Sequence, residues 1–310
     1  MTHISDVVIV GAGAAGLATA ACLAQRGVRA DVLEAGPDAG HTWASTYNAL
    51  RLHTVRRFSG LPLYPMPRGY PRYAARDQVV TYLRDYAAHF GIQPHFGSAV
   101  TRATLAGDGW QVETRDGDTW QARVLVAASG VYANPYAAMY PGQETYTGTV
   151  MHSSEYRSPA AFKGQRVLVV GAGNSGAEIA VDLMDGGARV TVAIRQGVNA
   201  VPLSLLGVPI QYWALLVERA PRLMGALAPV MLRRSAARLR RAGIPKSPEP
   251  VLQAHGIPII GLRLLDAART GKIAIAGAIE RFEPHGVRYR DGASAEYDAI
   301  ILATGFRPAL

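Results

Sequence analysis

Cysteine is nearly absent from this sequence, in which Cys22 is the only one among 310 residues. Flavoproteins that reduce disulfides pass electrons through a pair of cysteines, so a single thiol excludes that class. Cys22 lies in an alanine-rich helical stretch, where a small thiol packs as well as an alanine. We therefore expect a buried structural thiol without a redox role.

Clusters of catalytic side chains are also missing. The sequence has no Ser/His/Asp arrangement, no carboxylate pair and no metal-ligand spacing, and its histidines are dispersed. No catalytic side chain and no metal site are therefore assigned. An enzyme with this sequence would depend on a cofactor for its chemistry.

Long hydrophobic runs are absent as well. Charged residues and prolines interrupt the apolar stretch Leu203–Leu232, which excludes a membrane span there. The N-terminus leads directly into the apolar run Val7–Val10, without the basic and long apolar segments of a secretory signal. With 49% hydrophobic and 18% charged residues, the sequence predicts a folded cytoplasmic protein.

The formal net charge of +9 comes mostly from arginine. The arginines are scattered and do not interleave with aromatic residues, so no nucleic-acid partner is expected. Met231–Arg241 has arginines at near-helical spacing. We interpret this stretch as a solvated helix face, with membrane contact as the less favoured alternative.

The first chemical motif follows the β-branched run Asp6–Val10. Three glycines then open an alanine-rich helix that reaches about Arg26: Gly11, Gly13 and Gly16. They permit a tight turn, the approach of a pyrophosphate, and close packing of helix on strand. A second strand, Arg29–Leu33, ends in Glu34, whose carboxylate suits a ribose and repels a ribose 2′-phosphate. This unit predicts an FAD site; the alternative is a tight structural turn.

The same order returns after the strand Arg166–Val170. The turn that opens a helix through about Asp185 contains Gly171, Gly173, Asn174, Ser175 and Gly176. The next strand, Arg189–Ile194, ends in Arg195, a guanidinium that can bind a phosphate. This unit predicts an NADPH site, and the alternative for Arg195 is an ordinary exposed arginine.

The fold class expected from this pattern is α/β, with two Rossmann-like dinucleotide-binding domains. Strands are expected near residues 111–113 and 123–127, and a helix over 77–90. Two apolar strands end in similar segments, one with Ser129 and Gly130 and the other with Thr304 and Gly305. Both segments should lie at carboxyl ends of strands, where α/β sheets bind ligands.

One segment matches a known family. Tyr146–Tyr156 resembles the signature of flavin-containing monooxygenases (class B flavoprotein monooxygenases), and its position between the two glycine motifs is that of the family. Further stretches resemble the YUCCA-type indole-3-pyruvate monooxygenases most closely: 50–53, 57–62, 70–73, 173–178 and 297–305. Tyr156 stands where Baeyer–Villiger relatives carry tryptophan, which favours the other branch.

The resemblance implies an NADPH domain inserted in an FAD domain. Residues 1–160 would form the first part of the FAD domain, 161–297 the NADPH domain, and 298–310 a return to the FAD domain, truncated at Leu310. Trp43 would lie close to the flavin, and Ser153 and Ser154 near the nicotinamide nucleotide. His152 would link the domains and place the cofactor rather than transfer protons.

The activity implied is that of a monooxygenase that uses FAD and NADPH and forms a C4a-(hydro)peroxyflavin with O2. The substrate would be a small organic molecule, either an aromatic 2-oxo acid such as indole-3-pyruvate or a soft nitrogen or sulfur nucleophile. Two alternatives stay open: an uncoupled NADPH oxidase or flavin reductase, and a non-catalytic nucleotide-binding protein. A homodimer also stays open.

Overall fold

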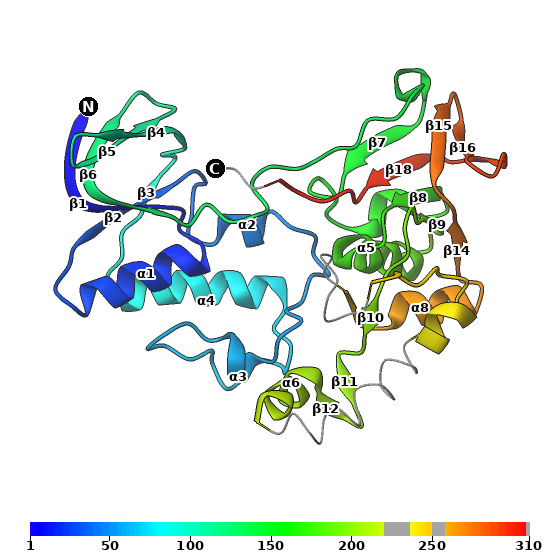
Figure 1. Cartoon of the computed structure of the whole chain (residues 1–310), viewed down its shortest axis with the longest axis horizontal. Coiled ribbons are helices and arrows are strands. Elements are labelled where there is room, and N and C mark those ends of the chain that lie inside the picture. The colour runs from blue at the N-terminus through cyan, green and yellow to red at the C-terminus, as the bar shows by residue number, and fades with distance from the viewer. Residues whose placement is uncertain (220–235, 250–257, 308–310) are drawn as a thin grey trace. The chain divides into compact units, whose positions relative to one another are not determined.

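The computed structural model describes residues 1–219, 236–249 and 258–307. The chain divides into two compact units (Figure 1). The first unit contains Met1–Thr46, Thr54–Asn134, Phe306 and Arg307, and the second contains Tyr47–His53 and the described residues between Pro135 and Gly305.

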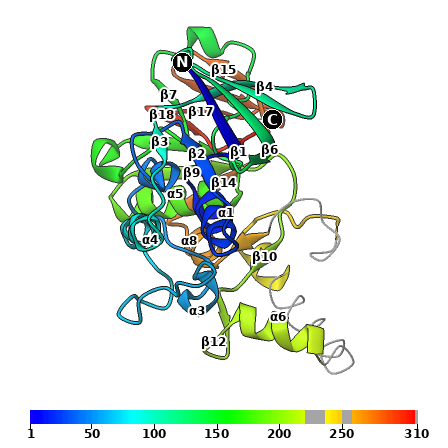
Figure 2. The same ribbon diagram turned by 90° about the vertical axis from the view of Figure 1, so that its left-hand side faces the viewer.

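The first unit is built on a six-stranded sheet in the order β3-β2-β1-β6-β5-β4. Its strands are β1 (Thr2–Val10), β2 (Ala30–Glu34), β3 (His95–Phe96), β4 (Val100–Ala106), β5 (Gly109–Thr114) and β6 (Thr119–Ala127). The neighbouring strands β3, β2, β1 and β6 are parallel. Strands β5 and β4 extend the sheet beyond β6 in antiparallel fashion. Figure 2 shows β1 and β6 running side by side.

The helices of the first unit are α1 (Ala14–Ala24), α2 (His41–Ala44), α3 (Arg56–Ser59) and α4 (Arg76–His89). Helix α1 connects the parallel neighbours β1 and β2 and lies beside α4 (Figure 1). The β-branched run of β1 is buried, and Val8 and Leu33 share a cluster with Trp120. A buried apolar strand followed by a helix and a parallel strand is the Rossmann unit that the sequence predicts.

The second unit is built on a five-stranded parallel sheet in the order β14-β9-β8-β18-β7. These strands are β7 (Thr149–His152), β8 (Arg166–Val170), β9 (Arg189–Ala193), β14 (Ile273–Ala276) and β18 (Ala299–Leu302). A separate antiparallel sheet contains β15 (Ile279–Glu283), β16 (Gly286–Tyr289) and β17 (Ser294–Glu296). Other elements within the described residues include α5 (Asn174–Asp185), α6 (Ile210–Arg219), α8 (Arg263–Arg269), β10 (Ala200–Val201), β11 (Ser204–Leu205), β12 (Val208–Pro209), β13 (Ile259–Ile260), and the 3₁₀ turns Gln143–Thr145 and Pro159–Phe162.

The strand β8 is buried on both faces because the sheet is covered on both sides. Val167 and Val169 pack in one cluster with helix α5, whereas Leu168 and Val170 pack in another with Phe282 of β15. Alternate residues of a strand point to opposite faces, so a continuous apolar run is what a strand in this position needs.

The structure confirms the α/β fold with two Rossmann-like units, but it divides the chain elsewhere than expected. The sequence interpretation started the second domain at residue 161 and ended it at 297. In the structure β18 pairs with both β7 and β8, so Thr149–His152 and Ala299–Leu302 are strands of the second unit. The hydrogen bonds between these strands join segments far apart in sequence, which a local pattern does not reveal.

The arginine-rich stretch Met231–Arg241 lies only partly within the described residues, and its first half lies outside them. Over the part of the chain that the structure describes, no helix is long and apolar enough to cross a membrane.

Two candidate dinucleotide cradles

Each glycine turn that leads from a strand into a helix is a candidate dinucleotide site, which we call a cradle. The first cradle, between β1 and α1, requires a glycine at position 11. Gly11 has a φ of +107°, and a Cβ placed on it would lie 2.5 Å from the carbonyl oxygen of Ala128. Ala128 is fixed there because its N–H donates to Val10 O at 2.9 Å, while Gly11 N–H donates to Leu33 O at 2.7 Å. The turn thus connects β1, β2 and the end of β6 in one place.

The other two glycines of this cradle have different roles. A Cβ on Gly16 would lie 1.9 Å from Gly11 O, so helix and turn approach too closely for any side chain. A Cβ on Gly13 would meet no atom within 4 Å. Gly13 precedes α1 without a side-chain cap, and Ala14 and Ala15 in the first turn of the helix are exposed. A pyrophosphate fits such a site.

Glu34 supports this turn directly. Its Oε2 accepts a hydrogen bond from Ala12 N–H at 2.7 Å, and its Oε1 accepts one from Gly36 N–H at 2.8 Å. The sequence predicted a ribose acceptor here and missed the role in shaping the loop. Each carboxylate oxygen has a further lone pair, so the two roles are compatible.

The second cradle repeats the first. Gly171 has a φ of +106°, and a Cβ on it would lie 2.5 Å from Ala303 O. A Cβ on Gly176 would lie 2.1 Å from Gly171 O, whereas one on Gly173 would meet nothing within 4 Å. Ala303 N–H donates to Val170 O at 2.9 Å, as Ala128 does to Val10. The two cradles therefore match in detail, including the alanine whose carbonyl oxygen lies against the first glycine, Ala128 in one and Ala303 in the other.

The cradles differ in the side chain that follows the second strand. Arg195 stands two residues after β9 and is exposed. Ile194 N–H donates to Ala276 O at 2.9 Å, which places Arg195 at the carboxyl edges of β9 and β14. Burial raises the pKa of the nearby Tyr140 hydroxyl, and the positive charge of Arg195 opposes that shift. An exposed guanidinium at this edge can bind a phosphate.

The structure also places the two small-residue segments. Gly130 follows Ser129 at the end of β6 in the first unit, with a φ of +74°. Thr304 and Gly305 belong to the second unit, and the chain returns to the first unit at Phe306. Thr304 Oγ1 donates to Tyr136 O, and Gly305 O accepts from Tyr136 N–H at 2.9 Å.

His152 lies beside Gly305 in the second unit. It is buried, its Nδ1 accepts from Ser154 N–H at 3.1 Å, and its Nε2 lies 3.1 Å from Gly305 O. These partners require a neutral imidazole with the proton on Nε2, which donates to Gly305 O. Burial lowers the pKa of His152, although Gly305 and Glu155 act in the opposite direction. Ser153 is buried beside it, and its N–H donates to Leu302 O at 3.0 Å.

The positions of the remaining predicted residues do not by themselves indicate cofactor binding. Asn174 Oδ1 accepts from Ile260 N–H at 2.7 Å, so this side chain holds β13 against α5. Ser175 lies in the first turn of α5. Trp43 is half-buried in the short helix α2 of the first unit. Their assignment to cofactor binding stays a prediction.

Sequence reasoning missed the surroundings of Glu178. This residue of α5 accepts a hydrogen bond from Tyr47 OH at 2.6 Å and also bonds to His53 Nε2. Glu178 and His53 both lie in stretches that resemble the family, but the partners stand more than a hundred residues apart. No local spacing could have indicated the pairing.

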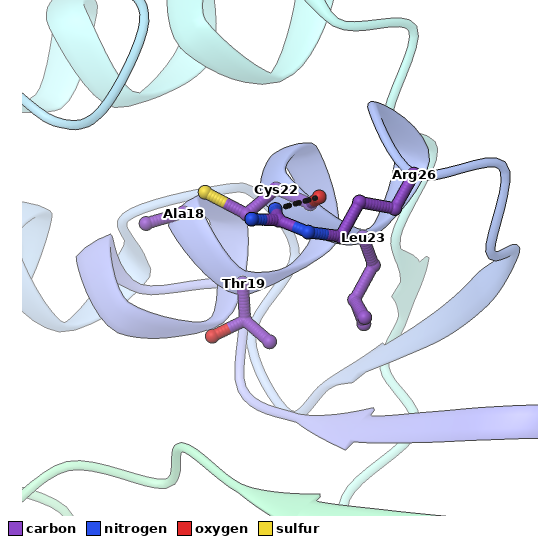
Figure 3. A pocket seen from close by; sticks show the side chains of 5 residues that line it. All are labelled: Ala18, Thr19, Cys22, Leu23 and Arg26. Carbon is purple, nitrogen blue, oxygen red and sulfur yellow. Dashed lines mark hydrogen bonds between the residues drawn. The ribbon is translucent and has the colours of Figure 1, made fainter.

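Cys22 lies at a shallow hollow on α1 (Figure 3). Its side chain is half-buried rather than buried, which corrects the expectation. The hollow is lined by residues of α1 and of the turn that follows it: Ala18, Thr19, Cys22, Leu23 and Arg26. Arg26 Nη1 donates to Cys22 O at 3.2 Å. Because four of these residues belong to α1 and Arg26 lies two residues after its end, this surface lacks the converging polar groups of a ligand site.

Known proteins are similar in sequence to nearly the whole chain. Residues 8–204 match the family described as pyridine nucleotide-disulphide oxidoreductase. The chain is 40% identical to the indole-3-pyruvate monooxygenase YUCCA1 of Oryza sativa subsp. japonica, over 99% of this chain and 78% of that protein. It is 34% identical to YUCCA6 of Arabidopsis thaliana, over 98% and 76%.

Solved structures agree with the fold. A flavin-containing monooxygenase from Stenotrophomonas maltophilia superposes with a TM-score of 0.75 at 27% identity, over 99% of this chain and 80% of that one. The closed form of cyclohexanone monooxygenase gives a TM-score of 0.75 at 20% identity, over 99% and 71%. At that identity the second likeness concerns the fold alone.

Proposed function

This chain belongs to the pyridine nucleotide-disulphide oxidoreductase family, among its flavin-containing monooxygenases, and from that premise we propose an NADPH-dependent oxygenation of an aromatic 2-oxo acid. It is a flavin-dependent monooxygenase that works with FAD and NADPH. When bound, the flavin supplies the oxygen chemistry and the pyridine nucleotide supplies the hydride.

The observation that carries the cofactor assignment is the contrast between Glu34 and Arg195 on matched frames. Both cradles present an open glycine and an uncapped helix start, as a pyrophosphate requires. Glu34 would repel a 2′-phosphate, whereas Arg195 would attract one. We therefore assign FAD to the first unit and NADPH to the second, with the hydroxyls of Ser153 and Ser154 beside the nicotinamide nucleotide.

Substitution of Arg195 tests this assignment. Arg195→Ser should lower kcat/KM for NADPH by about 10- to 100-fold, because a charge-assisted hydrogen bond is worth about 1.5–3 kcal/mol. The value for NADH should change little, since NADH has no 2′-phosphate. Arg189→Ser, at the other end of β9, serves as the matched control. Equal losses with both nucleotides would overturn the role of Arg195.

The substrate proposal rests on relatives named indole-3-pyruvate monooxygenases at 33–40% identity. Such a substrate needs a cation for its carboxylate, and Arg51 and Arg57 are both exposed. Indole-3-pyruvate should be decarboxylated with nearly one product per NADPH. If hydrogen peroxide instead accounts for all NADPH consumed, the protein is an oxidase towards this substrate, and amines or sulfides are the next substrates to assay.

A further inference from the structure

The segment Tyr47–His53 belongs to the second unit, although the residues before and after it belong to the first. Glu178 holds both ends of this crossing segment. Tyr47 OH donates to Glu178 Oε2 at 2.6 Å, and His53 Nε2 bonds to Glu178 Oε1. One carboxylate thus uses each of its oxygens for a different end of the segment.

Further contacts fix the crossing segment. Asn48 N–H donates to Arg157 O at 2.9 Å, and Gln211 Nε2 donates to His53 O at 2.6 Å. Tyr47 is only 6% exposed, and its ring lies 6.3 Å from that of Tyr156. The segment is therefore packed into the second unit.

Glu178 also stands on the helix that opens the second cradle. Helix α5 begins at Asn174, directly after the open glycine Gly173, and Glu178 follows about one turn later. A single side chain thus connects the helix that would face the pyridine nucleotide with the chain that enters and leaves the first unit.

We propose that Glu178 is a positioning residue, which fixes the crossing segment on the nucleotide helix and so supports the rate of flavin reduction by the pyridine nucleotide bound there. This inference rests on the proposed function. Hydride transfer is sensitive to misplacement of about 1 Å, which can cost about 100-fold in rate. In the proposed function, nucleotide binding depends instead on the cradle glycines and on Arg195, whereas the hydrogen bonds of Glu178 go to Tyr47 and His53.

Glu178→Gln is the informative change because an amide keeps the size but has one acceptor instead of two. Its oxygen can accept a hydrogen bond from Tyr47 or from His53 but not from both, and its nitrogen can only donate. Asp182→Asn is the matched control on the same helix. Asp182 Oδ2 accepts from Tyr156 OH at 2.7 Å, a bond made outside the crossing segment.

The first test needs no turnover. Glu178→Gln should raise amide hydrogen exchange in residues 47–53, and trypsin cleavage after the exposed Arg51, by at least about 10-fold. Asp182→Asn should leave both unchanged, and thermal unfolding should show that both variants stay folded. Unchanged exchange and cleavage in Glu178→Gln would overturn the proposal.

The second test measures anaerobic flavin reduction in the FAD-loaded protein. Glu178→Gln should lower the limiting reduction rate by about 10- to 100-fold while the NADPH concentration at half-maximal rate changes little. Equal limiting rates in wild type and variant would overturn the positioning role. Failure of NADPH to reduce even the wild type would instead contradict the proposed function.

Discussion

At the scale of single residues, some cradle glycines are required by the backbone conformation, and others are not. Gly11 is required by a left-handed backbone and by Ala128 O, whereas Gly13 has φ −80° and ψ −173°, which any residue can adopt. The fold therefore explains Gly11 but does not demand a glycine at position 13, where we propose that a bound pyrophosphate needs the space.

Alanine substitutions test this distinction. Gly11→Ala should lower the free energy of unfolding by about 1–3 kcal/mol, because the backbone strain and the contact with Ala128 O act together. Gly13→Ala should cost less than about 1 kcal/mol but weaken FAD binding by at least about 10-fold. Urea unfolding and flavin titration of both variants give the comparison, and unchanged FAD affinity in Gly13→Ala would contradict the assignment.

His152 should make the stability of the second unit depend on pH. Because burial lowers its pKa below the ordinary 6.5, the unfolded chain binds the proton more readily than the folded protein. The stabilisation is therefore complete above pH 6.5 and decreases as the pH falls from 6.5 towards the folded-state pKa.

His152→Gln should reduce this dependence when the free energy of unfolding is measured between pH 5 and 8, a range that spans the titration of an ordinary histidine. His285→Gln, at an exposed histidine, is the control and should keep the wild-type slope. A wild-type slope in His152→Gln would show that other groups cause the dependence.

At the scale of elements, the sequence predicted what is local and missed what is not. The two strand-turn-helix units follow from apolar runs and glycine spacing, and α5 ends at Asp185 as expected. The pairing of β18 with β7 and β8 depends on hydrogen bonds between distant segments. The bonds of Asn174 to Ile260 and of Glu178 to Tyr47 are likewise set by tertiary structure.

The place of β18 in the second unit can be tested by truncation of its core side chain. Ile301 is fully buried in the cluster beneath α5, so Ile301→Ala should lower the free energy of unfolding of that unit by about 2–5 kcal/mol. Val124→Ala, at a half-exposed strand position of the first unit, should change it by less than about 0.5 kcal/mol. Chemical denaturation of both variants provides the measurement, and a small loss in Ile301→Ala would contradict this packing.

At the scale of the whole molecule, the chain contains two copies of one nucleotide-binding design that differ in a charge. The sequence could predict both copies and the charge difference, since these depend on residues within each unit. It could not predict the crossing segment, because Tyr47–His53 is assigned to the second unit only by its tertiary contacts.

The most direct test of the central claim, that the cradles hold different dinucleotides, is anaerobic reduction of the FAD-reconstituted protein followed in the visible spectrum. Our account predicts that the protein binds FAD and that NADPH bleaches its absorption at least about 10-fold faster than NADH at equal concentration. Equal rates with both nucleotides, or no flavin binding at any FAD concentration, would contradict it.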